Sequence, residues 1–440
     1  MLDEERAAEV VEKVLATASA DHVDVSLNGS STANLRFARN TVSTSGTQTD
    51  ASVSVTTTFG TRSGSSTVNQ LSDESLEVCV RRAEELAKLS PEDPEFMPPL
   101  PQQEIAAIDA GVDPSPPEVM AEGARVCIAE AERAGLVAAG FAKSSSDVEC
   151  MANSAGFFGF HRSGAATFSM TARTEAGDGS GWSSRVGEVM SDIDFRSAAS
   201  QAVEKARRSV KPKPLEPASY VTILEPACVA DLVARLMWNL DARETDEGRS
   251  WLSKPGGGNQ IGDELFPKWI QVRSDPGDPA CLQRPWAYSG LPQVPRVWIA
   301  DGKVQTVRRD RFWAKNTETE PVPFAPNTLM SGSDKSVEDL VRETERGVLI
   351  TSLWYIRSVD PQTLLCTGLT RDGIFWIEDG EIAHPVTNFR WNDSPVRVLK
   401  NALEASRPVR VSPRGWGSTN VVVPALKVSG FELSSVSDAI

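Results

Sequence analysis

The side chains best suited to metal or proton-transfer chemistry are few in this sequence and lie far apart. The three histidines are His22, His161 and His384, and each is more than a hundred residues from the next. No helix can therefore present two imidazoles on one face, as an H-E-x-x-H metal site requires. A metal site assembled from distant residues stays open, but each histidine is more typical of a surface or strand-end residue.

The sequence also lacks the motifs of activated serine nucleophiles. It contains no G-x-S-x-G and no S-x-x-K accompanied by S-D-N. A Ser-His-Asp triad would need His161 or His384 as its base, and nothing nearby in the sequence distinguishes either one. The glycine-rich stretches GDGSGW (177–182) and GGGNQIGDE (256–264) predict loops. The first lies between expected strands, and the second has no Lys-Ser/Thr pair to hold a phosphate.

The composition is typical of a globular protein with more than one domain. The chain has 440 residues, of which 40% are hydrophobic and 24% charged, and this length predicts two or three domains. The formal net charge of −15 argues against a direct nucleic-acid partner, which would need a basic surface. No apolar stretch reaches membrane-spanning length, and the acidic N-terminus has no signal-peptide pattern, so we expect no membrane partner.

The six cysteines are scattered along the chain without a C-x-x-C spacing. A disulfide framework or a zinc ribbon would bring them closer together in the sequence. We therefore expect reduced cysteines and a cytoplasmic protein.

Hydrophobic periodicity predicts an α+β fold whose first domain covers residues 1–214. A helix, a meander of Ser/Thr/Val-rich strands and a second helix occur in residues 1–100 and recur in residues 114–211, so the domain contains a pseudo-repeat. The meanders are expected to be antiparallel, with VDVSLN and NLRFAR as separate strands, and likewise VAAGFAKSSS and VECMANSAG. The proline-rich stretch PEDPEFMPPLPQQE predicts an extended, exposed linker.

Residues 215–440 predict a β-rich C-terminal domain. Short strands recur in it, with hairpin turns at Asp301-Gly302 and Asp379-Gly380. GVLITSLWYIR is expected to form one strand, and PVRVLKNALEAS a helix.

The stretch PACVADLVARLMWNL, residues 226–240, predicts an amphipathic helix. Its apolar face comprises Val229, Leu232, Val233, Leu236 and Leu240. Asp231 and Arg235 form an i, i+4 pair, which we expect on the opposite side of the helix. The apolar face carries no histidine and no carboxylate.

Several segments are together similar to the TldD/TldE (PmbA) metallopeptidase family. They are RFARNTVSTSGTQTDASVSV, NSAGFFGF, DPQTLLCTGLTRDGIFWIEDGEIAHPVTNFRWNDSP and VVVPALKV. The resemblance runs from about residue 3 to the C-terminus. Its most specific element, GVLITSLWYIRSVDPQTLLCTGLTRDG, is similar to the TldE branch of the family.

The resemblance implies a heteromeric peptidase whose two kinds of subunit differ in metal content. TldD-type subunits carry zinc on a helical H-E-x-x-x-H motif with a distal cysteine, whereas TldE-type subunits share the fold but lack the metal. Asp231, Leu232 and Leu236 align with the first His, the Glu and the second His, and leucine can neither ligate zinc nor activate water. The stretch RVSPRGWGSTNVVVP, where the cysteine is expected, contains none.

This similarity favours a zinc-less, TldE-like subunit with no catalytic residue, metal or cofactor of its own. Such a subunit would shape the substrate cavity and present sheet edges to an extended peptide, while a TldD-like partner supplies the zinc. The complex would degrade or mature short unfolded peptides.

Two alternatives stay open on the same fold, so the sequence does not decide whether the chain alone is an enzyme. One is a stand-alone, metal-free hydrolase or transferase, and the other a homodimeric peptide-binding module. Arg357, Arg371 and Asp372 are the candidate substrate-binding residues, because they lie in the most family-like segment. A salt-bridged structural role is the more typical one for such residues. The sequence identifies neither the natural peptide nor its cleavage site.

Overall fold

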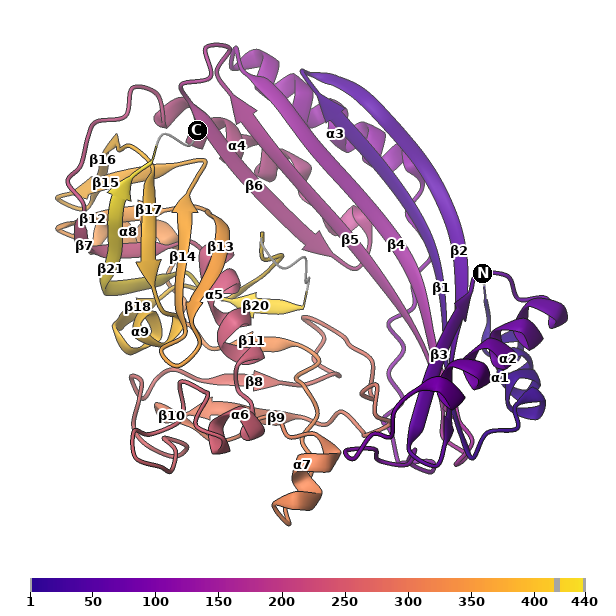
Figure 1. Cartoon of the computed structure of the whole chain (residues 1–440). Coiled ribbons are helices and arrows are strands. Elements are labelled where there is room, and N and C mark those ends of the chain that lie inside the picture. Colours follow the sequence, from indigo (N-terminus) through magenta and orange to yellow (C-terminus); the bar gives the residue numbers. More distant parts are fainter. Residues whose placement is uncertain (1, 415–419, 438–440) are drawn as a thin grey trace.

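The computed structural model describes residues 2–414 and 420–437 and divides them into an N-terminal and a C-terminal part (Figure 1). The N-terminal part is built on a six-stranded antiparallel sheet with the order β3-β2-β1-β4-β5-β6. Its strands are β1 (His22–Ala38), β2 (Thr41–Phe59), β3 (Arg62–Val68), β4 (Val137–Asn153), β5 (Phe158–Arg173) and β6 (Ser180–Gly187). Its helices are α1 (Glu4–Thr17), α2 (Asp73–Leu89), α3 (Pro117–Arg133) and α4 (Phe195–Arg208), with a 3-10 turn at Met190–Asp192.

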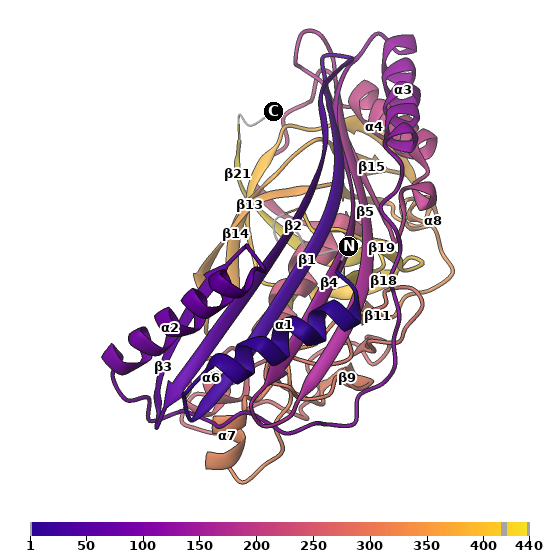
Figure 2. The same cartoon turned by 90° about the vertical axis from the view of Figure 1, so that its right-hand side faces the viewer.

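One face of this sheet is covered by helices. Side chains of alternating strand residues pack in one cluster with α1 and α2 and in another with α3 and α4. Figure 2 shows the two helix pairs lying over opposite ends of this outer face. The other face is concave and turns toward the C-terminal part (Figure 1). The sheet is therefore a curved wall whose inner surface is free to line a cavity.

The strands are longer than the sequence predicted. VDVSLN and NLRFAR belong to one strand, β1, and VAAGFAKSSS and VECMANSAG belong to β4. The predicted break within β1 contains Gly29. Gly29 is paired with Ala51 of β2 on one side and with Val148 of β4 on the other. A ladder on both sides holds an extended glycine in place, whatever its intrinsic freedom.

The C-terminal part contains two sheets. The nine-stranded sheet has the order β13-β14-β17-β21-β7-β12-β15-β16, with β18 paired to β21, and the six-stranded sheet has the order β10-β9-β8-β11-β20-β19. The strands are β7 (Ala218–Leu224), β8 (Val272–Ser274), β9 (Arg296–Ala300), β10 (Lys303–Val304), β11 (Thr328–Met330), β12 (Arg346–Ile350), β13 (Leu353–Asp360), β14 (Leu365–Thr370), β15 (Ile374–Glu378), β16 (Glu381–Pro385), β17 (Phe389–Asp393), β18 (Ala402–Ala405), β19 (Val409–Val411), β20 (Val421–Val423) and β21 (Leu426–Val436). The helices are α5 (Pro226–Trp238), α6 (Ala242–Asp246), α7 (Arg311–Asn316), α8 (Val337–Arg342) and α9 (Pro395–Lys400). Together the two parts confirm the predicted α+β fold class.

Two local predictions in this part were wrong and two were right. The expected helix over residues 395–406 stops after α9, since Ala402 leaves it to pair with Val428 of β21 as part of β18. The expected strand over residues 347–357 is divided between β12 and β13. The hairpins at Asp301-Gly302 and Asp379-Gly380 form as predicted, with positive φ at both residues of each turn.

The two parts meet around His161, on the concave face of β5. The ring is buried against Trp286 in a T-shaped contact with ring centroids 6.0 Å apart. Its Nδ1 lies 3.1 Å from the carbonyl oxygen of Ile108, which belongs to the linker between the two halves of the sheet. Burial lowers the pKa of His161 below its usual 6.5, because the charged imidazolium would lose its hydration.

His161→Asn is expected to flatten the dependence of stability on pH below about pH 6.5. Below about pH 6.5 the His161 imidazole takes up a proton more readily in the unfolded chain than in the folded chain. The wild type therefore loses stability as the pH falls below about 6.5, by at most about 1.4 kcal/mol per pH unit. Asparagine retains an amide donor close to the Nδ1 position but cannot titrate. Urea unfolding at pH 7.5 and pH 5.5 measures the effect. An equal loss of stability in both proteins would contradict it.

Candidate functional site

Helix α5 lies at the centre of the C-terminal part. Pro226 occupies its first turn, where the missing backbone N–H costs nothing. The predicted apolar face is buried in a hydrophobic cluster that draws on both C-terminal sheets. The helix ends at Trp238, two residues earlier than expected, and Leu240 still packs into the same cluster. The prediction of an amphipathic helix is thus confirmed, but Asp231 and Arg235 on the opposite side are not exposed.

Asp231 and Arg235 are only 1% and 8% exposed. The Arg235 Nη1 atom lies 3.7 Å from Asp231 Oδ1 and donates to the Asp231 carbonyl oxygen at 3.0 Å. Asp231 Oδ2 accepts from the backbone N–H of Arg414 at 3.2 Å. Burial lowers the pKa of Arg235, and the negative charge of Asp231 opposes this shift. A buried carboxylate needs such compensation, so this side of α5 is a polar wall covered by other chain segments.

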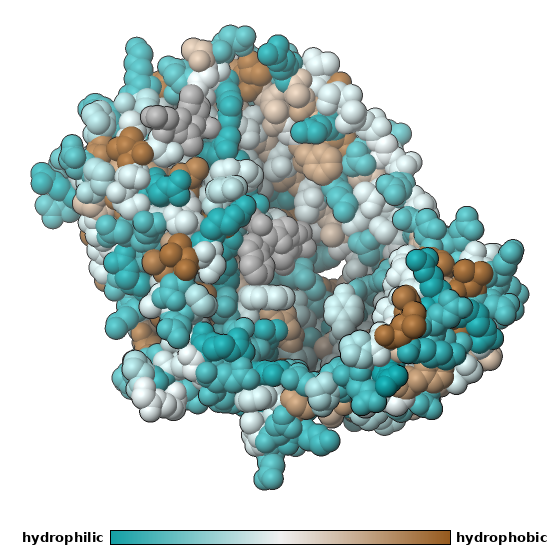
Figure 3. Space-filling view, viewed as in Figure 1, coloured by the Kyte–Doolittle hydropathy of each residue, from teal (hydrophilic) through white to brown (hydrophobic). Residues whose placement is uncertain are grey.

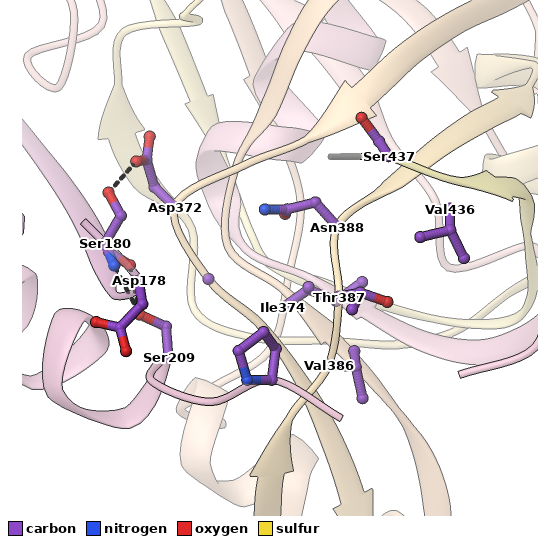
Figure 4. Close-up of a pocket in the computed structure, with 12 residues that line it drawn as sticks. Asp178, Ser180, Ser209, Asp372, Ile374, Val386, Thr387, Asn388, Val436 and Ser437 are labelled. Carbon is purple, nitrogen blue, oxygen red and sulfur yellow. Dashed lines mark hydrogen bonds between the residues drawn. The ribbon is translucent and has the colours of Figure 1, made fainter. Parts of the chain in front are cut away.

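Arg414 connects Asp231 to a second buried carboxylate, Asp372. The Arg414 Nη1 atom donates to Asp372 Oδ2 at 2.6 Å and to the Ser352 hydroxyl at 2.7 Å. The hydroxyl of Ser180 on β6 donates to the other oxygen of Asp372 at 2.5 Å (Figure 4). This group joins the N-terminal sheet, the turn after β14 and the segment after β19 in one network, which we call the Arg414 network (Asp231, Ser180, Ser352, Asp372 and Arg414).

Aromatic rings border the Arg414 network. The Arg414 guanidinium lies 4.8 Å from the ring centre of Trp182 and 4.9 Å from that of Trp354. The Arg371 guanidinium lies 5.4 Å from the Trp354 ring, and its Nε is 3.9 Å from Asp372 Oδ2. Cations at such distances from an indole ring are attracted to its face.

The three candidate substrate-binding residues do not form one cluster. Asp372 belongs to the Arg414 network and Arg371 lies beside it. Arg357 lies further along β13, where its guanidinium is 4.1 Å from the centre of the Tyr355 ring. Tyr355 has φ of +52° at an irregularity in the pairing of β13 with β14. Their assignment to substrate binding stays a prediction.

Sequence reasoning missed Arg414, Ser180 and Trp182. None of the three stands in a motif, because the network joins distant residues, and Ser180 and Asp372, which bond directly, are 192 positions apart. In the sequence, Arg414 is distinguished only by lying in the segment where the family resemblance places a cysteine ligand. Part of that segment, residues 415–419, lies outside the described residues.

The residues aligned with the zinc motif do not fit a zinc site. Leu232 and Leu236 point into the hydrophobic cluster, and Asp231 already interacts with Arg235 and Arg414. Cys228, one turn before Asp231, donates its thiol to the Ile350 carbonyl oxygen at 3.4 Å, and burial raises its pKa well above the usual value. Within residues 2–414 and 420–437, no three His, Cys, Asp or Glu side chains gather closely enough to hold a metal ion.

The surface between the two parts is hollowed, as the space-filling view in Figure 3 shows. On one side of the Arg414 network a pocket of about 200 Å³ is bordered by Asp372, Ser180, Asp178 and Ser209 (Figure 4). A larger pocket of about 450 Å³ lies beside the last turn of α5. The described helices include none that is both long and apolar enough to span a membrane.

Comparison with known proteins gives matches over nearly the whole chain. Family models match as PmbA/TldA metallopeptidase domain 1 over residues 23–87, the PmbA/TldA metallopeptidase central domain over 113–210 and the PmbA/TldA metallopeptidase C-terminal domain over 217–435. A curated relative, the metalloprotease PmbA homolog of Buchnera aphidicola, is 24% identical over 178 residues. That alignment covers 39% of this chain and 39% of the relative.

Three crystal structures share the fold over their whole length. TldE from Thermococcus kodakarensis has a TM-score of 0.85 at 18% identity, covering 98% of this chain and 100% of that one. A putative modulator of a DNA gyrase from Thermotoga maritima has a TM-score of 0.83 at 17% identity, with coverages of 97% and 99%. A putative modulator of DNA gyrase from Bacteroides thetaiotaomicron has a TM-score of 0.79 at 17% identity, with coverages of 99% and 100%.

Arg414→Met is expected to destabilise the chain by about 3–5 kcal/mol, because it leaves buried Asp372 without its hydrogen-bonded cation and with only the more distant Arg371 beside it. The double variant Arg414→Met/Asp372→Asn should recover part of this loss, since the neutral amide is cheaper to bury. Urea unfolding of the four proteins of the cycle measures the coupling. Arg342→Met, which removes an exposed ion pair on α8, is the control and should change stability little. Equal effects of Arg414→Met and Arg342→Met would contradict a structural role for the network.

Proposed function

Because the chain belongs to the PmbA/TldD metallopeptidase family, we propose that it is the zinc-less, TldE-like subunit of a two-subunit peptidase. In this proposal a TldD-like subunit carries the zinc on an H-E-x-x-x-H helix, and this chain completes the cavity in which short unfolded peptides are degraded or matured. The chain by itself has no catalytic residue and no cofactor.

The observation that carries the proposal is the environment of α5. At the positions aligned with the metal motif, two leucines belong to the hydrophobic core and one aspartate belongs to the Arg414 network. Zinc-bound water cannot be formed or activated by leucine side chains, and one carboxylate does not make a zinc site. A chain that keeps the family fold but has these residues on α5 needs another subunit to supply the zinc and the activated water.

The sheet has an open edge on which a partner could dock. The outer side of β2 pairs with β3 only over Val53–Phe59, which leaves residues 41–52 as an edge. Residues 41–50 are exposed on both faces, and Asp50 is the one charged residue among them. A long edge with neither lysine nor proline is prone to pair with another strand. We assign this edge to a strand of the TldD-like partner, because a partner with the same fold offers a matching edge.

The remaining expectations follow from composition. With a net charge of −15 the chain is not expected to contact nucleic acid directly. All six cysteines are unpaired and buried, which supports a cytoplasmic location. The alternative of a stand-alone hydrolase finds little support in Ser180, whose hydroxyl donates to Asp372 and has no imidazole beside it in the Arg414 network.

The first test is hydrolysis of a fluorescently labelled unfolded peptide by this chain, by its TldD-like partner, and by the mixture. Activity and about one bound zinc per heterodimer are expected only where the partner is present, with the mixture most active. A partner whose motif Glu is replaced by Gln is the matched control, and it should abolish the activity of the mixture. Chelator-resistant turnover by this chain alone would refute the proposal.

The second test concerns the open edge of β2. Thr47→Lys/Thr49→Lys adds two charges to the exposed edge and should weaken association with the partner by about tenfold or more, without altering the unfolding of the isolated chain. Asn69→Lys/Gln70→Lys places the same charge beyond the end of β3 and serves as the control. Size-exclusion chromatography and titration calorimetry measure association. If both double variants bind the partner like the wild type, the partner docks elsewhere.

A further inference from the structure

The larger pocket is lined by aromatic side chains that neither the fold nor the Arg414 network explains. It has a volume of about 450 Å³ and lies between the last turn of α5, the loop 281–294 and the concave face of the sheet. Its aromatic lining consists of Trp238, Trp286, Tyr288 and Phe324. Pockets of this size and character are typical of small-ligand and side-chain binding.

Three of these rings are held in place although they are exposed. Trp238 is 47%, Phe324 39% and Tyr288 73% exposed. Trp238 and Phe324 contact one another with ring centres 5.2 Å apart. Arg308 lies 5.4 Å from the Trp238 ring and Arg284 lies 4.1 Å from the Tyr288 ring. Two of the rings therefore lie beside guanidinium groups and the third packs against one of these two rings, so that the three form an exposed aromatic surface.

A buried hydrogen-bond donor borders the same pocket. Trp286 is 1% exposed, and its Nε1 atom has no hydrogen-bond partner among the described residues. This N–H is buried from solvent, so Trp286 contributes apolar ring surface to the wall of the pocket.

The wall opposite the aromatic rings is acidic. Ser30 of β1 pairs with Asp50 of β2 on one side and with Asp147 of β4 on the other, so both carboxylates project from the same face of the sheet. They border a second hollow of about 380 Å³. Glu149 borders this hollow and the aromatic pocket alike, and it carries an ion pair of 2.7 Å to Arg284. The described lining of the second hollow includes no lysine or arginine.

We propose that the aromatic pocket and the acidic wall together bind an extended peptide in which a large apolar residue is next to a lysine or arginine. Successive side chains of an extended strand point in opposite directions. The apolar side chain enters the aromatic pocket, and the basic side chain beside it reaches Asp50 and Asp147 on the sheet. This inference names the substrate class for the proposed function, and so rests on it.

The position of the aromatic pocket along α5 also fits a peptidase subunit. Trp238 follows Asp231 by seven residues, which is about 10 Å along the helix. An extended peptide covers that distance with about three residues. A peptide anchored at the aromatic pocket could thus reach the level of Asp231 on the helix axis within about three residues.

The test measures binding to the full-length chain alone, using four fluorescently labelled octapeptides in a Gly/Ser background. Their central pairs are Phe-Lys, Phe-Glu, Ser-Lys and Ser-Glu, and binding is followed by fluorescence anisotropy. The Phe-Lys peptide should bind most tightly, with a loss of about tenfold when either residue of the pair is replaced. Added salt should reduce the difference in affinity between the Lys and Glu peptides but not the difference between the Phe and Ser peptides.

Variants of the chain separate the two subsites. Trp238→Ala and Tyr288→Ala should each remove the advantage of Phe over Ser, and Asp50→Asn/Asp147→Asn should remove the advantage of Lys over Glu. Trp269→Ala changes another partly exposed tryptophan and serves as the matched control. Thermal unfolding identifies any variant that fails to fold, and Tyr288→Ala, at the most exposed ring, then carries the test.

Two outcomes would overturn the inference. They are equal binding of the four peptides, and equal effects of Trp238→Ala, Tyr288→Ala and Trp269→Ala. Neither depends on the TldD-like partner. Partner-dependent hydrolysis without pocket-dependent binding would therefore leave the proposed function standing and remove only the pocket. If the chain binds the peptides selectively but never stimulates hydrolysis by a partner, the pocket stands and the proposed function is removed.

Discussion

The buried charge of Asp372 constrains how the two parts of this protein fit together. A carboxylate in such a position is stable only with a cation and further hydrogen bonds around it. Arg414 provides the cation from the C-terminal part, and Ser180 provides a hydrogen bond from the edge of the N-terminal sheet. The sheet must therefore approach the turn after β14 closely at β6. The rest of its concave face curves away from that contact and leaves a cavity.

Several other contacts between the parts are also ionic. Ion pairs that cross between them are Lys205–Glu225, Arg243–Glu95, Arg284–Glu149 and Arg410–Glu188. By contrast, each of the four hydrophobic clusters found in the described residues lies within one part. A continuous apolar interface would draw the sheet onto the C-terminal part and close the space between them. Separate cores joined by ion pairs allow the cavity to stay open and wet.

The sequence predicted those features that depend on local pattern. The period of α5, the hairpin turns and the α+β class follow from neighbouring residues, and the structure confirms them. It did not predict that β1 continues through Gly29, because two flanking strands decide that, nor that residues 402–405 leave α9 to join β21. The division at residues 214 and 215 and the pseudo-repeat stay predictions. The Arg414 network was beyond reach, since Ser180, Asp372 and Arg414 meet only after folding.

The two sides of α5 have different surroundings, and these explain why its residues do not fit a zinc site. Leu232 and Leu236 lie on the core side of the helix, whereas Asp231, Arg235 and Trp238 lie on sides that meet the Arg414 network or the aromatic pocket. Replacing the two leucines by Glu and His would bury polar groups in an apolar cluster instead of creating a metal site. A zinc site would also require Asp231 to give up its bonds to Arg235 and Arg414. The residues of the helix are thus adapted as a whole to support the cavity wall.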